Sequence, residues 1–179
     1  MTDKEEKAII LDYLPYGYPL DKKTMPLAQA IGSQNLTLLE LVPRRGLTLE
    51  PREEVYIGEG KRDKIYFIRG KLPFNKITES AKEVLKEQLE KQIVVNEKKF
   101  VDFFNNAQPI NTRLHQLELL PGLGAKHTEA ILEERKNKPF ESFEDLRKRV
   151  KNLPDPKITI GKRIMEELEG KERHLLFIN

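Results

Sequence analysis

Residues 117–132, with the sequence LELLPGLGAKHTEAIL, hold the pattern in this chain that most directly suggests chemistry. Apolar residues recur there at helical spacing, and Pro121, Gly122 and Gly124 interrupt it, which predicts two helices joined by a tight turn. Pro121 disfavours the α region for Leu120, so the first helix should end there. The glycines lack Cβ atoms, so another molecule's backbone can approach closely. The unpaired N–H groups that begin the second helix then face a gap that suits a phosphate.

The turn resembles the helix-hairpin-helix motif of DNA- and RNA-binding proteins, whose hairpin reads apolar residue, glycine, apolar residue, glycine. The resemblance implies that backbone amides hold one phosphate and that carbonyl oxygens of the hairpin hold a monovalent cation. The implied amides are those of Gly122, Gly124, Lys126 and His127, and the implied carbonyls are those of Glu118, Leu120 and Leu123. His127 stands where the motif more often has a small or hydroxyl residue.

Two other interpretations of these glycines are open to test. The stretch can be a plain turn between helices in a module that binds other proteins. A dinucleotide fingerprint fits poorly, because its glycines follow a strand and include a third at the start of the helix, where this chain has His127. We therefore reject the dinucleotide interpretation and favour contact with nucleic acid.

Positive charge gathers just after this turn. The whole chain has a net charge of only +3, which argues weakly for a polyanionic partner. Residues 135–151 contain seven basic and three acidic side chains, a local net charge of +4. Such a run is often only a solvated face, but its position beside a phosphate-binding turn favours function. The basic residues expected to contact nucleic acid are Lys126, Arg135, Lys136, Lys138, Arg147 and Lys148.

Composition excludes several classes of protein. Cysteine is absent, which removes disulfides, cysteine-ligated zinc and thiol nucleophiles. The chain opens with the charged MTDKEEK and has no apolar run of membrane-spanning length, so a soluble, cytoplasmic protein without a membrane partner is expected.

No pattern of residues argues for an enzyme. The three histidines, His115, His127 and His174, are too scattered to form a recognisable ligand set. Neither a G-x-S-x-G turn nor a Walker-type loop is present. We therefore expect a non-catalytic protein without a cofactor, apart from the monovalent cation implied at the hairpin.

The first part of the chain predicts β-structure. Residues 7–14 and 35–42 form apolar runs of strand length, with a short amphipathic piece around MPLAQAIG between them. EEVYIGEG and DKIYFIRGKL suggest two more strands, joined as a hairpin by residues 59–62. Four or five strands within about seventy residues, with glycine-rich turns, predict a small antiparallel barrel that looks like an OB-fold.

The rest predicts helices. Residues 77–94 form an amphipathic helix capped by Thr78 or Ser80, and Asn96 should cap the next one. The segment 110–120 is the expected first helix of the hairpin, and Ser142 should cap a later helix. The tail RHLLFIN is expected to pack back as a strand or a cover. The predicted fold class is α+β, with an OB-like domain over 1–76, connecting helices over 77–108 and an all-helical helix-hairpin-helix domain over 109–179.

Three segments resemble an archaeal family of uncharacterised proteins predicted to bind RNA, which join an OB-like domain to a helix-hairpin-helix domain. They read VYIGEGKRDKI, FVDFFNNAQPINTRLHQLELLPGLG and ERKNKPFESFEDLRKRV. We expect a nucleic-acid-binding protein, and the resemblance favours RNA over DNA. The alternative is a protein interaction module that docks on a ribonucleoprotein or replication assembly.

Overall fold

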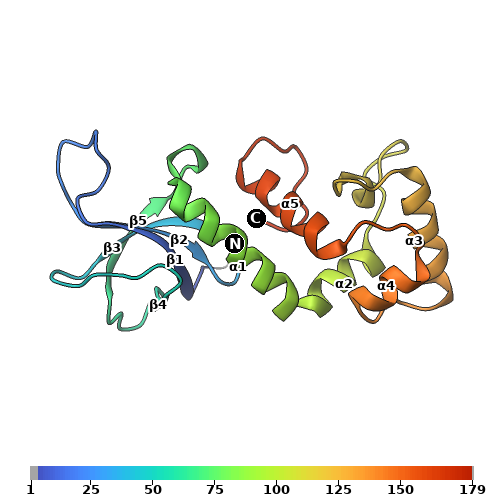
Figure 1. Cartoon of the computed structure of the whole chain (residues 1–179), viewed down its shortest axis with the longest axis horizontal. Coiled ribbons are helices and arrows are strands. Elements are labelled where there is room, and N and C mark those ends of the chain that lie inside the picture. The colour runs from blue at the N-terminus through green and yellow to red at the C-terminus, as the bar shows by residue number, and fades with distance from the viewer. Residues whose placement is uncertain (1–3, 179) are drawn as a thin grey trace. The chain divides into compact units, whose positions relative to one another are not determined.

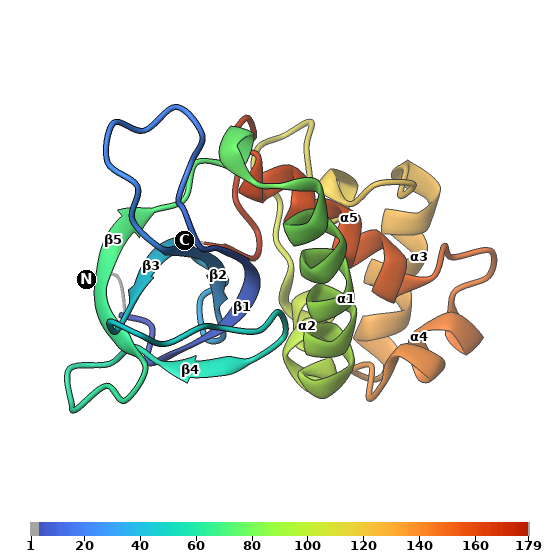
Figure 2. The ribbon, with the colours of Figure 1, turned by 60° about the vertical axis from the view of Figure 1, so that its left-hand side comes forward.

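A five-stranded antiparallel sheet forms the first part of the chain in the computed structural model, which describes residues 4–178 (Figure 1). Its strands are β1 (Lys7–Leu14), β2 (Leu27–Gly32), β3 (Leu38–Pro43), β4 (Glu54–Tyr56) and β5 (Ile65–Lys71). The spatial order is β4-β1-β2-β3-β5. Because β4 returns to lie beside β1, the first four strands form a Greek key. The sheet curls into a half-barrel, as Figure 2 shows.

The chain divides into two compact units, which we describe separately. The sheet unit comprises residues 4–88 and 167–178, and the helical unit comprises residues 89–166. Every residue of β2 and β3 is buried, which agrees with their nearly continuous apolar sequences. The core of the curled sheet consists of small and branched apolar side chains: Ala8, Ile10, Ala28, Ala30, Leu39, Leu41, Leu49, Val55, Ile57 and Ile65.

The predicted hairpin between the last two strands is wrong. β4 pairs with β1 and β5 pairs with β3, so these two strands form opposite edges of the sheet. The loop between β4 and β5 forms no strand ladder and is held by hydrogen bonds of side chains. The Tyr56 hydroxyl accepts a hydrogen bond from the Gly60 N–H (3.0 Å), and Arg62 Nε donates to the Gly58 carbonyl (2.8 Å).

A polar network joins the sheet to the first long helix. The 3-10 turn η1 (Phe74–Lys76) leads into α1 (Glu79–Val95), and the Thr78 hydroxyl accepts from the Ala81 N–H, as the predicted cap should. The buried Gln29 of β2 donates to the Lys76 carbonyl and accepts from the Thr78 N–H. These bonds fix the start of α1 on the sheet.

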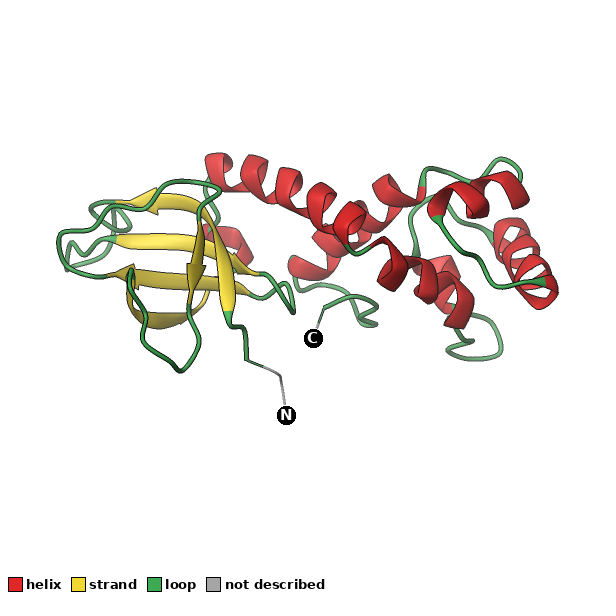
Figure 3. Ribbon diagram, turned by 90° about the horizontal axis from the view of Figure 1, so that it is seen from below, coloured by secondary structure: helices red, strands yellow, loops and turns green. Residues whose placement is uncertain are grey.

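The helical unit contains the end of α1, then α2 (Glu97–Asn106), η2 (Gln116–Leu119), α3 (Ala125–Asn137), α4 (Phe143–Arg149) and most of α5 (Pro156–Leu168), drawn in red in Figure 3. Ser142 caps α4 as predicted, because its hydroxyl accepts from the Asp145 N–H (2.9 Å). Asn96 does precede α2, but its side chain donates to Gln92 and makes no cap.

The predicted helix over residues 110–120 is wrong. Only residues 116–119 are helical, as the single 3-10 turn η2. Polar side chains upstream bind the local backbone instead: the Asn111 carboxamide accepts from the Arg113 N–H, and His115 Nδ1 accepts from the Leu117 N–H. Such local bonds compete with the α-helical pattern and stop it from forming.

The C-terminal segment packs without forming a strand. Residues 171–178 are irregular, and the buried Glu167 carboxylate accepts from the N–H groups of Leu176, Phe177 and Ile178. Of the two alternatives predicted for the tail, the strand is therefore wrong. No helix within residues 4–178 combines the length and the apolar character that crossing a membrane requires.

Candidate functional site

The first turn, residues 120–124, connects η2 to α3 and depends on one glycine. Gly122 has a φ of +84°, a conformation that L side chains rarely adopt. A Cβ atom built on it would also lie 3.3 Å from Cγ of Pro154. The Leu123 N–H donates to the Leu120 carbonyl and closes the turn (3.1 Å). The sequence therefore folds tightly here because position 122 is glycine.

Several backbone donors at the start of α3 have no acceptor among the residues that the structure describes. Gly124 is the N-cap residue, is exposed and has an extended backbone. A Cβ atom on it would meet no atom within 4 Å. Four N–H groups lack an acceptor among residues 4–178: those of Gly122, Ala125, Lys126 and His127. These donors are concentrated where a 13-residue helix presents its positive dipole end.

His127 ties the start of α3 to the segment that precedes α5. Its Nε2 lies 3.1 Å from the carbonyl oxygen of Asn152, which can only accept, so Nε2 carries the proton. Its Nδ1 is then free to accept from the Gly124 N–H, at a long 3.5 Å. Of the four amides implied for phosphate, the Gly124 amide therefore already has a weak partner within the protein. The amides of Gly122, Lys126 and His127 have no partner among residues 4–178.

Five of the six predicted basic side chains are exposed. Lys126, Lys136 and Arg147 make no ion pair with any residue that the structure describes. Lys138 pairs with Glu141 and Lys148 with Glu144, each at 3.1 Å. Exposed pairs of this kind contribute little free energy, so an anionic ligand can compete for both lysines.

The sixth, Arg135, is directed into the protein. Its Nη1 donates to the carbonyls of Phe104 and Ala107 at 3.1 and 2.9 Å, which satisfies the C-terminal end of α2. Burial lowers the pKa of this guanidinium. Arg149, from the same basic run, is similarly engaged with Glu134, Asp145 and the ring of Phe140. Both arginines therefore stabilise the helical unit.

The carbonyls implied for a cation are partly available. The Leu120 carbonyl already accepts from the Leu123 N–H, whereas those of Glu118 and Leu123 accept no hydrogen bond from residues 4–178. The buried Arg163 donates to the neighbouring Leu119 carbonyl at 3.4 Å and so supports η2. Two of the three implied carbonyl oxygens are therefore free of hydrogen bonds from the described residues, and one is shared.

A second turn, residues 150–155, joins α4 to α5 and touches the first. The Asn152 carbonyl accepts from His127 of α3, and a Cβ atom built on Gly122 of the first turn would lie 3.3 Å from Cγ of Pro154. The Asp155 carboxylate accepts from the Lys157 N–H (3.0 Å) and caps α5. This cap was not predicted from the sequence, although an aspartate just before a proline that begins a helix is a recognisable signal.

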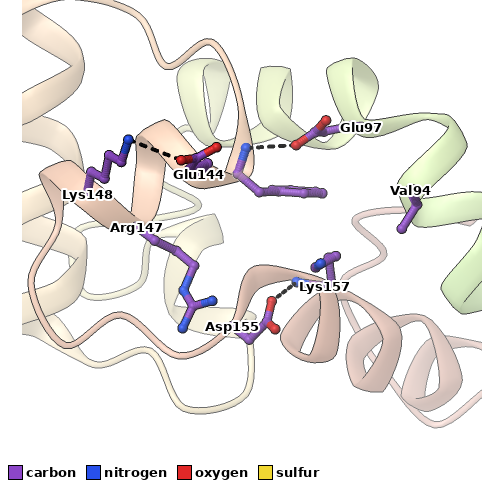
Figure 4. A pocket seen from close by; sticks show the side chains of 8 residues that line it. Val94, Glu97, Glu144, Arg147, Lys148, Asp155 and Lys157 are labelled. Atoms are coloured by element: carbon purple, nitrogen blue, oxygen red, sulfur yellow. Dashed lines mark hydrogen bonds and ion pairs between the residues drawn. The ribbon is translucent and has the colours of Figure 1, made fainter.

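A surface cavity of about 560 Å³ lies beside α4 and the start of α5 (Figure 4). Its wall brings Arg147 and Lys148 together with Lys157, which the sequence analysis did not include. Glu97, Glu144 and Asp155 line it too, and Glu97 accepts from the Phe143 N–H (3.0 Å). Three basic and three acidic side chains line this cavity, so its lining carries no net charge.

Comparison with known proteins assigns the chain to a family. It matches the family described as "Protein of unknown function (DUF655)" over residues 4–179. It is 43% identical over 176 residues to the uncharacterised protein MJ0038 of Methanocaldococcus jannaschii, covering 97% of this chain and 80% of that protein. The crystal structure of Af1531 from Archaeoglobus fulgidus, of the same family, is similar with a TM-score of 0.86 and 46% identity, covering 98% of this chain and all of that one. The chain therefore belongs to the DUF655 family of uncharacterised archaeal proteins.

Proposed function

We propose that this protein binds nucleic acid without catalysing a reaction on it, and that the first turn holds one backbone phosphate. The observation that carries the proposal is the row of unpaired N–H groups on Ala125, Lys126 and His127, beside a glycine turn and an unpaired lysine side chain. Phosphate oxygens are strong acceptors that suit such a group of donors. The exposed Lys136, Lys138, Arg147 and Lys148 add cations on the same unit.

In this proposal, η2, the first turn and α3 act as a helix-hairpin-helix unit whose first helix is reduced to one 3-10 turn. The curled sheet acts as an OB-like domain, which its Greek-key strand order supports. Contacts to phosphate do not read bases, so the turn should bind with little sequence specificity. RNA is favoured over DNA only through the resemblance described above, because a phosphate site does not sense the 2′-hydroxyl.

The rival proposal, a module that docks on a protein within a ribonucleoprotein or replication assembly, needs an exposed apolar surface near the turn. The large exposed hydrophobic side chains of the helical unit are Val94, Val95 and Ile158. None of them lies within residues 122–151 of the sequence, although Val94 lines the same cavity as Arg147 and Lys148. The exposed charged side chains of residues 122–151 are six basic and four acidic ones: Lys126, Lys136, Lys138, Arg147, Lys148 and Lys151, and Glu129, Glu133, Glu141 and Glu144. This composition supports a polyanionic ligand.

The test is binding of a fluorescein-labelled RNA, and of DNA with the same sequence, to the full chain over a series of salt concentrations. The logarithm of the affinity should fall linearly with the logarithm of salt concentration, with a slope of about −0.7 to −0.9 per neutralised phosphate. Lys126→Ala should make that slope shallower by about one and should weaken binding to all nucleic-acid sequences equally. The control is Lys91→Ala, which removes an exposed lysine of α1 outside both turns. A salt-insensitive complex, or equal effects of the two variants, would refute the proposal.

A further inference from the structure

The sheet unit has a cavity of its own, of about 560 Å³, between the two edges of the curled sheet. Residues of β4 and β5 both line it, although these strands do not pair with each other. Its volume lies in the range of small-molecule sites. The cavity is therefore the opening that remains where the half-barrel does not close.

The floor of this cavity is apolar. Leu39 and Ile57 belong to the core of the sheet, and Ile68 packs against that core. Leu39 and Ile57 are already buried, so a ligand on this floor would cover chiefly the half-buried Ile68. The floor therefore suits a flat, weakly polar group.

One wall is an aromatic ring in a fixed position. Tyr56 is 38% exposed, and its hydroxyl accepts from the Gly60 N–H. A Cβ atom on Gly58 would lie 2.5 Å from that hydroxyl oxygen, so the ring in this position packs directly on the backbone of Gly58. The loop after β4 is thus built around the ring, and an ordered ring stacks on a planar ligand at low entropic cost.

Unpaired positive charge lines the same cavity. Lys71 has no ion pair within the described part of the chain, and Arg62 uses only Nε, on the Gly58 carbonyl. The acidic lining is mostly engaged: Glu5 accepts from three backbone N–H groups, and Glu59 pairs with Lys4. The lining as a whole carries three basic and three acidic side chains, and Lys71 and Arg62 are the basic ones without an ion pair among the described residues, so they are the groups that can contact an anionic group.

We infer that this cavity binds a nucleotide, with the base against Tyr56 and the apolar floor and the phosphate on Lys71 and Arg62. An apolar floor, a seated aromatic ring and adjacent cations match the three chemical features of that ligand class. The ligand can be a free mononucleotide or an unpaired nucleotide within a strand. This site belongs to the sheet unit and does not depend on the first turn.

The experiment measures binding of AMP and UMP, and separately of a labelled six-residue oligouridylate, to the full chain by calorimetry and fluorescence anisotropy. Lys71→Glu should weaken binding about tenfold, because it reverses a charge beside the phosphate. Lys22→Glu is the matched control, an exposed lysine of the same unit that does not line the cavity, and it should change affinity less than twofold. Thr37→Phe fills the cavity from a side chain without a hydrogen bond to the described residues and should also weaken binding.

A difference between Lys71→Glu and Lys22→Glu with mononucleotides identifies a free nucleotide as sufficient. The same difference with the oligonucleotide alone identifies a strand. If the two variants behave alike with every ligand, or if Thr37→Phe binds as the parent does, the inference is wrong. In a Gly124→Asp background, which disables the first turn, Lys71→Glu should still weaken mononucleotide binding relative to Lys22→Glu, so failure of one site is distinguishable from failure of the other.

Discussion

The two turns of the helical unit have related positions in the chain, but they differ in what satisfies the N–H groups of the helix that follows. Each follows a short helix and precedes a 13-residue one. At the first turn the cap residue is Gly124, which has no side chain, and the N–H groups of the next three residues are unpaired within the described chain. At the second turn the Asp155 carboxylate accepts from the Lys157 N–H, and α5 begins at Pro156, which has no N–H to donate.

The difference shows that a helix start becomes an anion site only when the chain does not supply its own anion. A carboxylate at the cap satisfies the donors and adds negative charge, so it both stabilises the helix and repels phosphate. Both turns also contain one residue with positive φ, Gly122 at +84° and Asn152 at +60°. The turns are thus similar in backbone shape, and their cap chemistry separates them.

The largest effect is expected from giving the first turn the cap of the second. Gly124→Asp should weaken nucleic-acid binding at least about tenfold, because a lost hydrogen bond to a charged group costs about 1.5–3 kcal/mol and the new charge adds repulsion. Folding should be unharmed, since a Cβ atom at this extended position meets no atom within 4 Å. The measurement is RNA affinity by anisotropy, alongside a urea denaturation curve.

Two variants at the same position act as controls for that result. Gly124→Asn supplies a neutral cap and should weaken binding less, and Gly124→Ala supplies no cap and should bind nearly as the parent does. If Gly124→Asp binds as tightly as Gly124→Ala, the open amides are not the phosphate site.

Gly122→Ala is expected to have the next largest effect, on stability. A side chain at a φ of +84° costs about 1–2 kcal/mol, and the contact with Pro154 at 3.3 Å adds to it. The reciprocal variant, Asn152→Gly, removes the same kind of strain from the second turn and should not destabilise comparably. Urea denaturation of both variants tests this, and equal losses would show that the backbone shapes are less alike than their φ values suggest.

Asp155→Ala should have a smaller effect, limited to stability. Loss of a helix cap costs about 1 kcal/mol. Nucleic-acid affinity should change less than twofold. Pro156 has no N–H, so the start of α5 still presents fewer free donors than the start of α3. A marked rise in affinity would mean that the carboxylate alone separates the two turns.

Local sequence predicted the elements that depend on nearby residues. The apolar run of β1, the stripe of α1 and the Ser142 cap are all determined within a few positions, and each was confirmed. Strand pairing was not predictable in this way. β4 pairs with β1, which is distant in the sequence, and no local signal distinguishes that pairing from a hairpin with β5.

The candidate site shows the same limit. The glycine turn and α3 could be read from spacing, but the role of Arg135 could not, because it depends on two carbonyls about thirty residues away. The helix predicted over residues 110–120 is absent for a local reason: the bonds made by Asn111 and His115 oppose helical periodicity.

The smallest expected effect is a pH dependence of stability that arises at η2, the 3-10 turn that precedes the first turn. Burial and the nearby charge of Arg135 lower the pKa of His115, whose Nδ1 accepts from the Leu117 N–H and so caps η2. A protonated imidazole cannot accept that bond. The stabilisation is therefore complete above the unfolded-state pKa of about 6.5 and is lost as the pH falls through the lower folded-state value.

His115→Asn tests the origin of this dependence. A carboxamide oxygen can accept from the Leu117 N–H and does not titrate, so the variant should keep η2 while its stability changes less between pH 7 and pH 5 than that of the parent. The measurement is the urea midpoint at each pH. A parent pH dependence that survives in His115→Asn would have to arise outside the cap of η2, and the assignment to His115 would be wrong.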